Sequence, residues 1–158
     1  MIRIGFGYDV HAFAPNRKLW LGGIEVPHTV GLLGHSDADV LLHALCDALL
    51  GAANLRDIGF QFPDTAAEYK DIDSKILLRR TMELLREKNY EFGNADCTIC
   101  AQTPKLLNYI PLMQQCIAEI METDIDNISI KATTTERLGF VGKEEGMAAF
   151  ATVLINKR

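Results

Sequence analysis

The sequence predicts an α+β domain in which helices cover one face of a mixed β-sheet. Apolar residues alternate with polar ones near both ends of the chain, as in strands, and recur at helical spacing in three stretches between them. Neither a repeat nor a linker divides the 158 residues, so a single domain spanning residues 1–158 is expected. The expected strands cover residues 2–11, 19–26 (a hairpin), 91–101, 128–134 and 147–155, and the expected helices begin near Ser36, Ser74 and Pro111.

The composition limits the classes of partner. The chain is 48% hydrophobic and carries a net charge of −5, whereas sequence-independent binding of nucleic acid needs a basic surface. No apolar run approaches the roughly 20 residues that span a bilayer. The N-terminus begins directly with strand-like residues rather than with a targeting segment. We therefore expect a cytoplasmic protein that binds neither nucleic acid nor membranes.

The first strand has two unlike faces. One face holds Asp9 and His11 together with Gly5 and Gly7, and we expect these glycines to keep it open for a ligand. After the strand, Gly22-Gly23 between two short apolar runs is typical of a tight hairpin. The apolar face of the strand consists of Ile2, Ile4, Phe6, Tyr8 and Val10.

Capping residues and apolar spacing define the three helices. The Ser36 hydroxyl can cap the first helix, with Asp39 in its first turn and Gly51 at its end. Residues 54–70 are expected to form an irregular loop. Pro111 suits the first turn of the third helix, because that turn needs no N–H from it.

The last strand, residues 147–155, is small or apolar on both faces. Helices of so small a domain cover one face of a sheet. The other face is therefore covered either by another subunit or, if the strand is central, by the same chain.

The four cysteines are expected to be reduced and structural. Cys97 and Cys100 form a CxxC pattern, but they lie three residues apart on an expected strand. Their thiols then point to opposite faces and cannot share a metal ion.

Asp9, His11 and His43 are candidate ligands of a catalytic zinc ion. Asp9 and His11 project from the same face of a strand, and His43 lies on the first helix. One carboxylate and two imidazoles leave a fourth coordination position open, as in catalytic zinc sites. The alternative is an ordinary strand end beside a solvated helix face. His43 is expected to lie in one polar stripe along the helix, together with the polar residues within about 40° of it, Ser36, Asp39 and Asp47.

Three further segments have compositions that suit ligands. Residues 131–136 join consecutive Thr hydroxyls, which suit phosphate oxygens, to the carboxylate of Glu136, which suits Mg²⁺ or Mn²⁺. The alternative is that Thr is simply a good strand residue. Residues 57–65 mix aromatic rings with carboxylates, which is more typical of a binding wall than of a turn. Residues 101–107 could shape a pocket with backbone groups.

Taken in order, these segments closely resemble the 2-C-methyl-D-erythritol 2,4-cyclodiphosphate synthase family. The resemblance runs from end to end without large insertions. It rests on five motifs in register: Gly7-Tyr8-Asp9-Val10-His11; Gly34-His35-Ser36-Asp37-Ala38-Asp39-Val40 through His43; Asp57-Ile58-Gly59 with Phe62-Pro63-Asp64-Thr65; Ala101-Gln102-Thr103-Pro104-Lys105; and Lys131-Ala132-Thr133-Thr134-Thr135-Glu136.

The resemblance implies a phosphorus–oxygen lyase of the non-mevalonate isoprenoid pathway. Such an enzyme converts 4-diphosphocytidyl-2-C-methyl-D-erythritol 2-phosphate into the cyclic diphosphate and CMP, by attack of the 2-phosphate on the β-phosphate. The resemblance further implies that Asp9, His11 and His43 hold Zn²⁺, and that Glu136 helps to hold Mg²⁺ or Mn²⁺.

The resemblance also implies roles for residues around the metals. His35 and Thr134 match positions of transition-state stabilisation, and Ser36 with residues 62–66 match contacts to the phosphorylated methylerythritol. Asp57 and Gly59 match ribose contacts, and residues 101–107 match the cytosine pocket. The residues implied to contact the substrate are Asp9, His11, His35, Ser36, Asp57, Ile58, Gly59, Phe62, Pro63, Asp64, Thr65, Ala66, Ala101, Gln102, Thr103, Pro104, Lys105, Leu106, Leu107, Thr133, Thr134, Thr135, Glu136, Phe140 and Lys143.

The family forms homotrimers with active sites between subunits, which fits the doubly apolar last strand. Where Lys143 stands, the family often has Arg, near a central cavity associated with isoprenoid diphosphates. Lys keeps the charge but loses bidentate phosphate binding, which puts this ligand in doubt. Two other hypotheses stay open. One is a metal-dependent phosphatase or phosphodiesterase, and the other is a non-catalytic trimer that binds isoprenoid diphosphates through Phe140 and Lys143.

Overall fold

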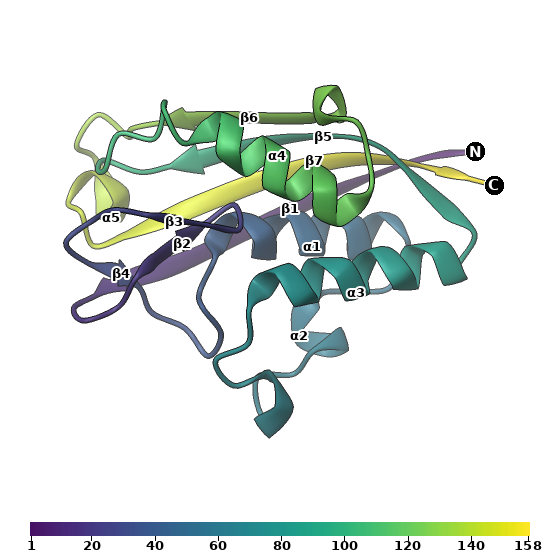
Figure 1. Cartoon of the computed structure of the whole chain (residues 1–158), viewed down its shortest axis with the longest axis horizontal. Coiled ribbons are helices and arrows are strands. Elements are labelled where there is room, and N and C mark those ends of the chain that lie inside the picture. The colour runs from purple at the N-terminus through teal and green to yellow at the C-terminus, as the bar shows by residue number, and fades with distance from the viewer.

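A computed structural model describes residues 1–158 and has two layers, a mixed five-stranded sheet and three long helices on one of its faces (Figure 1). The strand order is β4-β1-β7-β5-β6, and only β5 and β6 pair in parallel. This arrangement confirms the predicted α+β class. The elements are β1 (Ile2–Ala14), β2 (Leu19–Leu21), β3 (Ile24–Val26), β4 (Gly31–Leu32), α1 (Val40–Ala52), α2 (Ile58–Gln61), η1 (Ala67–Tyr69), α3 (Ser74–Glu87), β5 (Tyr90–Cys100), α4 (Ile110–Met121), η2 (Ile125–Asn127), β6 (Ile128–Thr133), α5 (Gly139–Gly142) and β7 (Gly146–Lys157).

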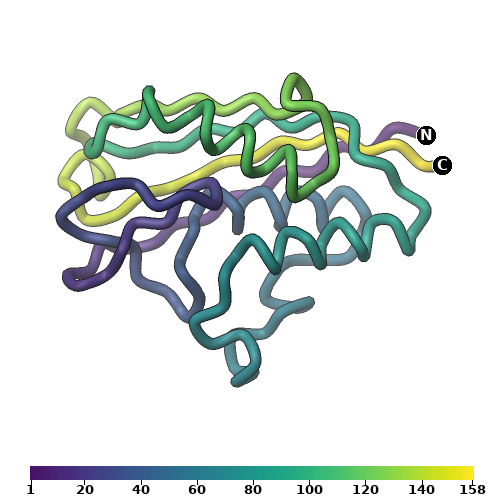
Figure 2. The backbone as a smooth tube through the Cα atoms, in the orientation of Figure 1, coloured from purple at the N-terminus to yellow at the C-terminus, as the bar shows by residue number.

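The two termini lie side by side at one end of the sheet (Figure 2), where Ile2 of β1 pairs with Asn156 of β7. β2 and β3 form a separate hairpin around Gly22 and Gly23. Both glycines have positive φ angles, as the predicted tight turn requires. None of the helices combines the length and the apolar character needed to cross a bilayer.

Helix α1 packs directly on the backbone of β1. A Cβ atom on Gly5 would lie 1.8 Å from the Ala48 carbonyl oxygen, and one on Gly7 would lie 1.9 Å from that of Ala44. The prediction that these glycines keep the face open for a ligand is therefore wrong, because a helix fills the space. The close approach brings α1 to the face of β1 that carries Asp9.

The opposite face of β1 carries the apolar side chains, and nothing in the chain covers it. Ile4 is 72% exposed and Phe6 is 63% exposed, and Phe150 of β7 packs its ring against Phe6 and Tyr8. On the other face of β7 the residues are buried under the helices. One face of the doubly apolar last strand is thus covered by this chain, whereas the other is covered only at Ala148, by Val141 of α5.

Helix α1 begins at Val40, so the predicted cap at Ser36 is wrong. Asp39 caps the helix instead, and its Oδ1 accepts the N–H of Leu42 at 3.0 Å. The same carboxylate accepts the N–H groups of Gly22 and Gly23, which fixes the hairpin to the start of α1.

Three other predictions about α1 and the following loop need correction. The helix continues through Gly51 to Ala52 rather than ending there. Residues 54–70 are not wholly irregular, because they contain α2 and η1. Asp39 is fully buried and bonded to the hairpin, so it does not join His43 in a polar stripe.

The long elements after residue 70 follow the predictions closely, whereas the short helices η2 and α5 were not predicted. Helices α3 and α4 begin within one residue of the predicted starts, and Pro111 lies in the first turn of α4. All four cysteines are free thiols. Cys97 lies in the main core, whereas Cys100 packs with Val141 and Ala148 on the other side of the sheet.

Candidate functional site

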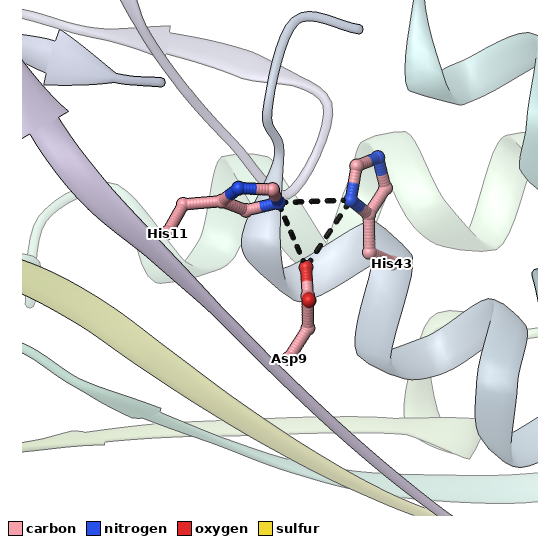
Figure 3. A group of neighbouring side chains, drawn as sticks. All are labelled: Asp9, His11 and His43. Atoms are coloured by element: carbon pink, nitrogen blue, oxygen red, sulfur yellow. Dashed lines mark hydrogen bonds and ion pairs between the residues drawn. The ribbon is translucent and has the colours of Figure 1, made fainter. Parts of the chain in front are cut away.

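Asp9, His11 and His43 meet where β1 passes helix α1 (Figure 3). Asp9 Oδ2 lies 2.9 Å from His11 Nε2 and 3.1 Å from His43 Nδ1. The two ring nitrogens are themselves 3.1 Å apart. One ligand atom from each side chain therefore points to a common centre.

The other nitrogen of each ring has a hydrogen-bond partner that orients it. His11 Nδ1 lies 2.9 Å from the carbonyl oxygen of Leu33. Because a carbonyl only accepts, Nδ1 donates to it, and in the neutral ring Nε2 then has the lone pair that a metal ion would need. His43 Nε2 lies within 3.1 Å of the hydroxyls of Ser36 and Ser74.

The electrostatics of the cluster favour a positive charge at its centre. Burial alone would raise the pKa of Asp9, but hydrogen bonds with His11 and His43 outweigh burial and lower it to about 2. Burial alone would lower the pKa of His43, but the bond to Asp9 raises it above its ordinary value. A proton or a metal cation can supply the charge that the carboxylate needs.

The geometry of the cluster fits a tetrahedral metal ion. Ligand atoms about 2.0–2.1 Å from a tetrahedral ion are separated by roughly 3.3 Å, close to the three distances here. Three protein ligands leave one coordination position for an exogenous oxygen.

A cavity of about 260 Å³ opens beside the cluster. It gathers predicted site residues from three separate segments, and it also brings in Tyr69, Ile72 and Leu77, which the sequence reasoning missed. Tyr69 packs edge-on against the Phe62 ring, and no local pattern pointed to that pairing. The lining residues are His11, His35, Ser36, His43, Ile58, Gly59, Phe62, Asp64, Tyr69, Ile72 and Leu77.

Helix α2 forms part of the wall of this cavity and is held by two carboxylates. Asp57 caps it by accepting the N–H of Phe60 at 2.8 Å. Asp47, one turn after His43 on α1, accepts the N–H of Ile58 at 2.8 Å. Asp57 thus orients the wall, while Pro63, Thr65 and Ala66 lie outside the lining of the cavity.

A second cavity, of about 230 Å³, lies at the end of β5 and β6 and shares no residue with the first. The Thr103 hydroxyl, outside the lining, donates to Glu144 at 2.8 Å, and Gln102 accepts the N–H of Arg137 at 3.2 Å. These bonds connect the 101–107 segment to the chain that follows β6. The lining residues are Ala101, Gln102, Pro104, Lys105, Leu106, Leu107, Ile110, Ala132, Thr133 and Thr134.

Glu136 lies in an exposed turn after β6, apart from the Asp9 cluster. Glu136 and Arg137 both have positive φ angles, and Thr134 Oγ1 accepts the N–H of Glu136 at 3.2 Å. The hydroxyl of Thr135 donates to the carbonyl of Leu138. The remaining predicted contacts, Phe140 and Lys143, lie in and just after α5 and line neither cavity.

Comparison with known proteins gives consistent matches. The YgbB family profile matches residues 2–156. Relatives named 2-C-methyl-D-erythritol 2,4-cyclodiphosphate synthase include one from Parabacteroides distasonis, 69% identical over 99% of this chain and 97% of its own. Another, from Bacteroides fragilis, is 66% identical over 99% of this chain and 98% of its own.

Solved structures agree over the whole chain. The bifunctional IspDF from Campylobacter jejuni is 45% identical with a TM-score of 0.96, over 100% of this chain and 43% of that one. The CDP complex of IspF from Plasmodium falciparum is 36% identical with a TM-score of 0.87, over 99% of this chain and 97% of that one. With the fold, the metal-ligand cluster and these matches in agreement, the chain belongs to the YgbB family.

Proposed function

We propose that this protein is a lyase that converts 4-diphosphocytidyl-2-C-methyl-D-erythritol 2-phosphate into 2-C-methyl-D-erythritol 2,4-cyclodiphosphate and CMP. The observation that carries the proposal is the convergence of Asp9, His11 and His43 in a chain 69% identical to a synthase of that name. The CDP bound to a related structure supports a substrate with a cytidine diphosphate end.

The proposed metal at the Asp9 cluster is Zn²⁺, because two imidazoles and one carboxylate with an open position are a ligand set of catalytic zinc. For Glu136 we propose Mg²⁺ or Mn²⁺, because its carboxylate stands beside Thr hydroxyls that suit phosphate oxygens. Bound at the phosphates, the two cations would neutralise charge and polarise the phosphorus under attack.

The protein's own residues then position rather than attack. The 2-phosphate oxygen of the substrate forms a new bond to the β-phosphorus, and the bond from that phosphorus to the CMP oxygen breaks. His35 and Thr134 would donate hydrogen bonds to the charge that develops on the phosphate oxygens. Folding the substrate for this in-line approach can contribute roughly 7–11 kcal/mol, so no protein nucleophile is required.

The two cavities divide the substrate between them in this proposal. Ser36 and residues 62–66 would hold the methylerythritol phosphate, and Asp57 with Gly59 would hold the ribose. Residues 101–107 would bind cytosine, largely through backbone groups.

We propose a homotrimer with active sites between subunits. Two observations support it. The apolar face of β1 and β7 is exposed in the single chain, and the cavities for the two ends of the substrate share no residue. The nucleotide end would then be bound by one chain and the metal end by its neighbour. With all four cysteines unpaired, the proposed location is the cytoplasm.

The test is to incubate purified protein with substrate, Zn²⁺ and Mg²⁺ and to identify the products by mass spectrometry. CMP together with the cyclic diphosphate supports the proposal. A linear hydrolysed product would instead favour the metal-dependent phosphatase or phosphodiesterase. Absence of turnover, with isoprenoid diphosphate binding that survives His43→Ala, would favour the non-catalytic binding trimer.

A further inference from the structure

Ser74 lies directly behind His43, on the side away from the metal-ligand centre. It is the first residue of α3, is fully buried, and places its Oγ 2.9 Å from His43 Nε2. The same hydroxyl lies 2.5 Å from Asp37 Oδ1, and the Ser74 backbone N–H donates to Asp37 Oδ2 at 3.0 Å. Both oxygens of the Asp37 carboxylate thus hold one serine.

These contacts favour a proton on Nε2 of His43 rather than on Nδ1. A carboxylate can only accept, so the Ser74 hydroxyl donates its single proton to Asp37. The Ser74 oxygen can then only accept from His43, which places a proton on Nε2. That proton leaves the lone pair of the neutral ring on Nδ1, the atom that faces Asp9 and His11. In the metal-free protein the Asp9 carboxylate favours the opposite tautomer, because it can accept from Nδ1, so the proton on Nε2 depends on Ser74.

The neighbouring Ser36 hydroxyl cannot impose this choice. Its oxygen lies 3.1 Å from His43 Nε2 and accepts the N–H of Ala38, but the structure gives its own proton no fixed acceptor. Ser36 can therefore either accept from Nε2 or donate to it. Of the two hydroxyls, only that of Ser74 has its proton held by an acceptor, Asp37, so only Ser74 must accept the hydrogen bond from His43 Nε2.

We infer that Asp37 and Ser74 are positioning residues of the metal centre, which hold His43 as the tautomer that can bind a metal through Nδ1. The inference rests on the proposed metal centre and extends it outward from the three ligands. Asp37 also accepts the N–H of Asp39 at 3.1 Å, so the same carboxylate connects the starts of α1 and α3. Outer partners of ligating histidines commonly change metal affinity by about 10–100-fold.

The test compares the full-length wild type with Ser74→Ala, Asp37→Asn and a matched control, Asp73→Ala. Asp73 caps the same helix by accepting the N–H of Lys75 at 2.9 Å, and none of its bonds reaches His43. Zinc affinity is measured by competition with a chelator of known affinity. The His43 tautomer is measured from ring ¹⁵N chemical shifts of metal-free protein, at a pH where the ring is neutral.

Ser74→Ala should weaken zinc binding by about 10–100-fold and shift the neutral His43 ring toward the tautomer that donates from Nδ1 to Asp9. Asp37→Asn keeps an oxygen acceptor, so it should act in the same direction but less strongly. Asp73→Ala should stay within about twofold of wild-type zinc affinity, since neither the three ligands nor the groups bonded to their rings change. The inference is overturned if Ser74→Ala and Asp37→Asn keep wild-type affinity and tautomer, or if Asp73→Ala loses as much zinc affinity.

Two further measurements keep the test decisive. If Ser74→Ala does not fold, Asp37→Asn decides alone, and wild-type affinity with an unchanged tautomer in that variant overturns the inference. Zinc uptake and cyclic product are followed in the wild type in the same series. If the wild type neither takes up zinc nor makes cyclic product, the proposed function is refuted. If the wild type does both, but the Ser74 and Asp37 variants keep its zinc affinity and His43 tautomer, only the positioning role is refuted.

Discussion

At the scale of single residues, His43 on α1 meets Asp9 and His11 of β1 at the proposed zinc site, so removing its ring tests that site directly. His43→Ala takes away one of three ligands, and we expect zinc content to fall from about one ion per chain to roughly a tenth of that, with the loss of nearly all cyclic product. Elemental analysis after gel filtration measures the zinc. His28→Ala is the control, since His28 packs on Phe13 outside the cluster. Wild-type zinc in His43→Ala would place the metal elsewhere.

The pH dependence of zinc affinity also belongs to the residue scale. The pKa of Asp9 is lowered to about 2, so Asp9 stays ionised and adds no dependence near neutrality. The bond to Asp9 raises the pKa of His43 above its ordinary value, so at pH values below that raised pKa zinc must displace a proton from the ring. Affinity should therefore rise with pH by up to about tenfold per unit, and level off above the His43 pKa. A chelator competition series from about pH 6 to about pH 9 measures this, and a profile that is flat over the whole range would contradict it.

At the scale of elements, the contact between β1 and α1 depends on the absence of a side chain at Gly7. Gly7→Ala would place a Cβ 1.9 Å from the backbone carbonyl of Ala44, which cannot rotate away. We expect a loss of about 2–4 kcal/mol in the free energy of unfolding, measured by urea titration, together with weaker zinc binding as α1 shifts. Gly51→Ala is the matched control, because a Cβ there meets nothing within 4 Å. It should stabilise α1 by about 0.5–1 kcal/mol, and equal effects of the two substitutions would refute the argument.

The position of the β2–β3 hairpin on α1 depends on the buried carboxylate of Asp39. Asp39→Ala removes the cap of α1 and leaves the buried N–H groups of Gly22 and Gly23 without their acceptor. Because unsatisfied buried donors cost more than a lost cap alone, we expect a loss of about 2–4 kcal/mol in the free energy of unfolding. Asp39→Asn keeps one acceptor oxygen and should lose less. Urea denaturation of both variants measures the difference, and an Asn variant no more stable than the Ala variant would contradict the proposed bonding.

At the scale of the whole molecule, periodicity was enough to predict the long elements, but neither the short ones nor how the elements meet. The two-residue repeat of a strand correctly placed Asp9 and His11 together, since side chains two residues apart project from the same face. It could not show that the glycine face of β1 lies inside the chain, because alternation alone favours burial of the apolar face. The glycine face lies inside through the docking of α1. Ser36 and Asp39 are both good caps, so local preference could not decide the start of α1. Helix α2 was missed because four residues are too few to show a helical period.

The uncovered apolar face of β1 and β7 makes a prediction about the assembly. Phe6, 63% exposed at the centre of this face, should be buried in the proposed trimer, so Phe6→Glu should give monomers by light scattering after gel filtration. The monomer should still bind about one zinc ion, because Asp9, His11 and His43 belong to one chain. It should make no cyclic product, since the cytosine and metal ends of the proposed site come from different copies. Ile125→Glu, on the short helix η2, should remain a trimer. A Phe6→Glu variant that is monomeric but fully active would show that one chain holds a complete active site.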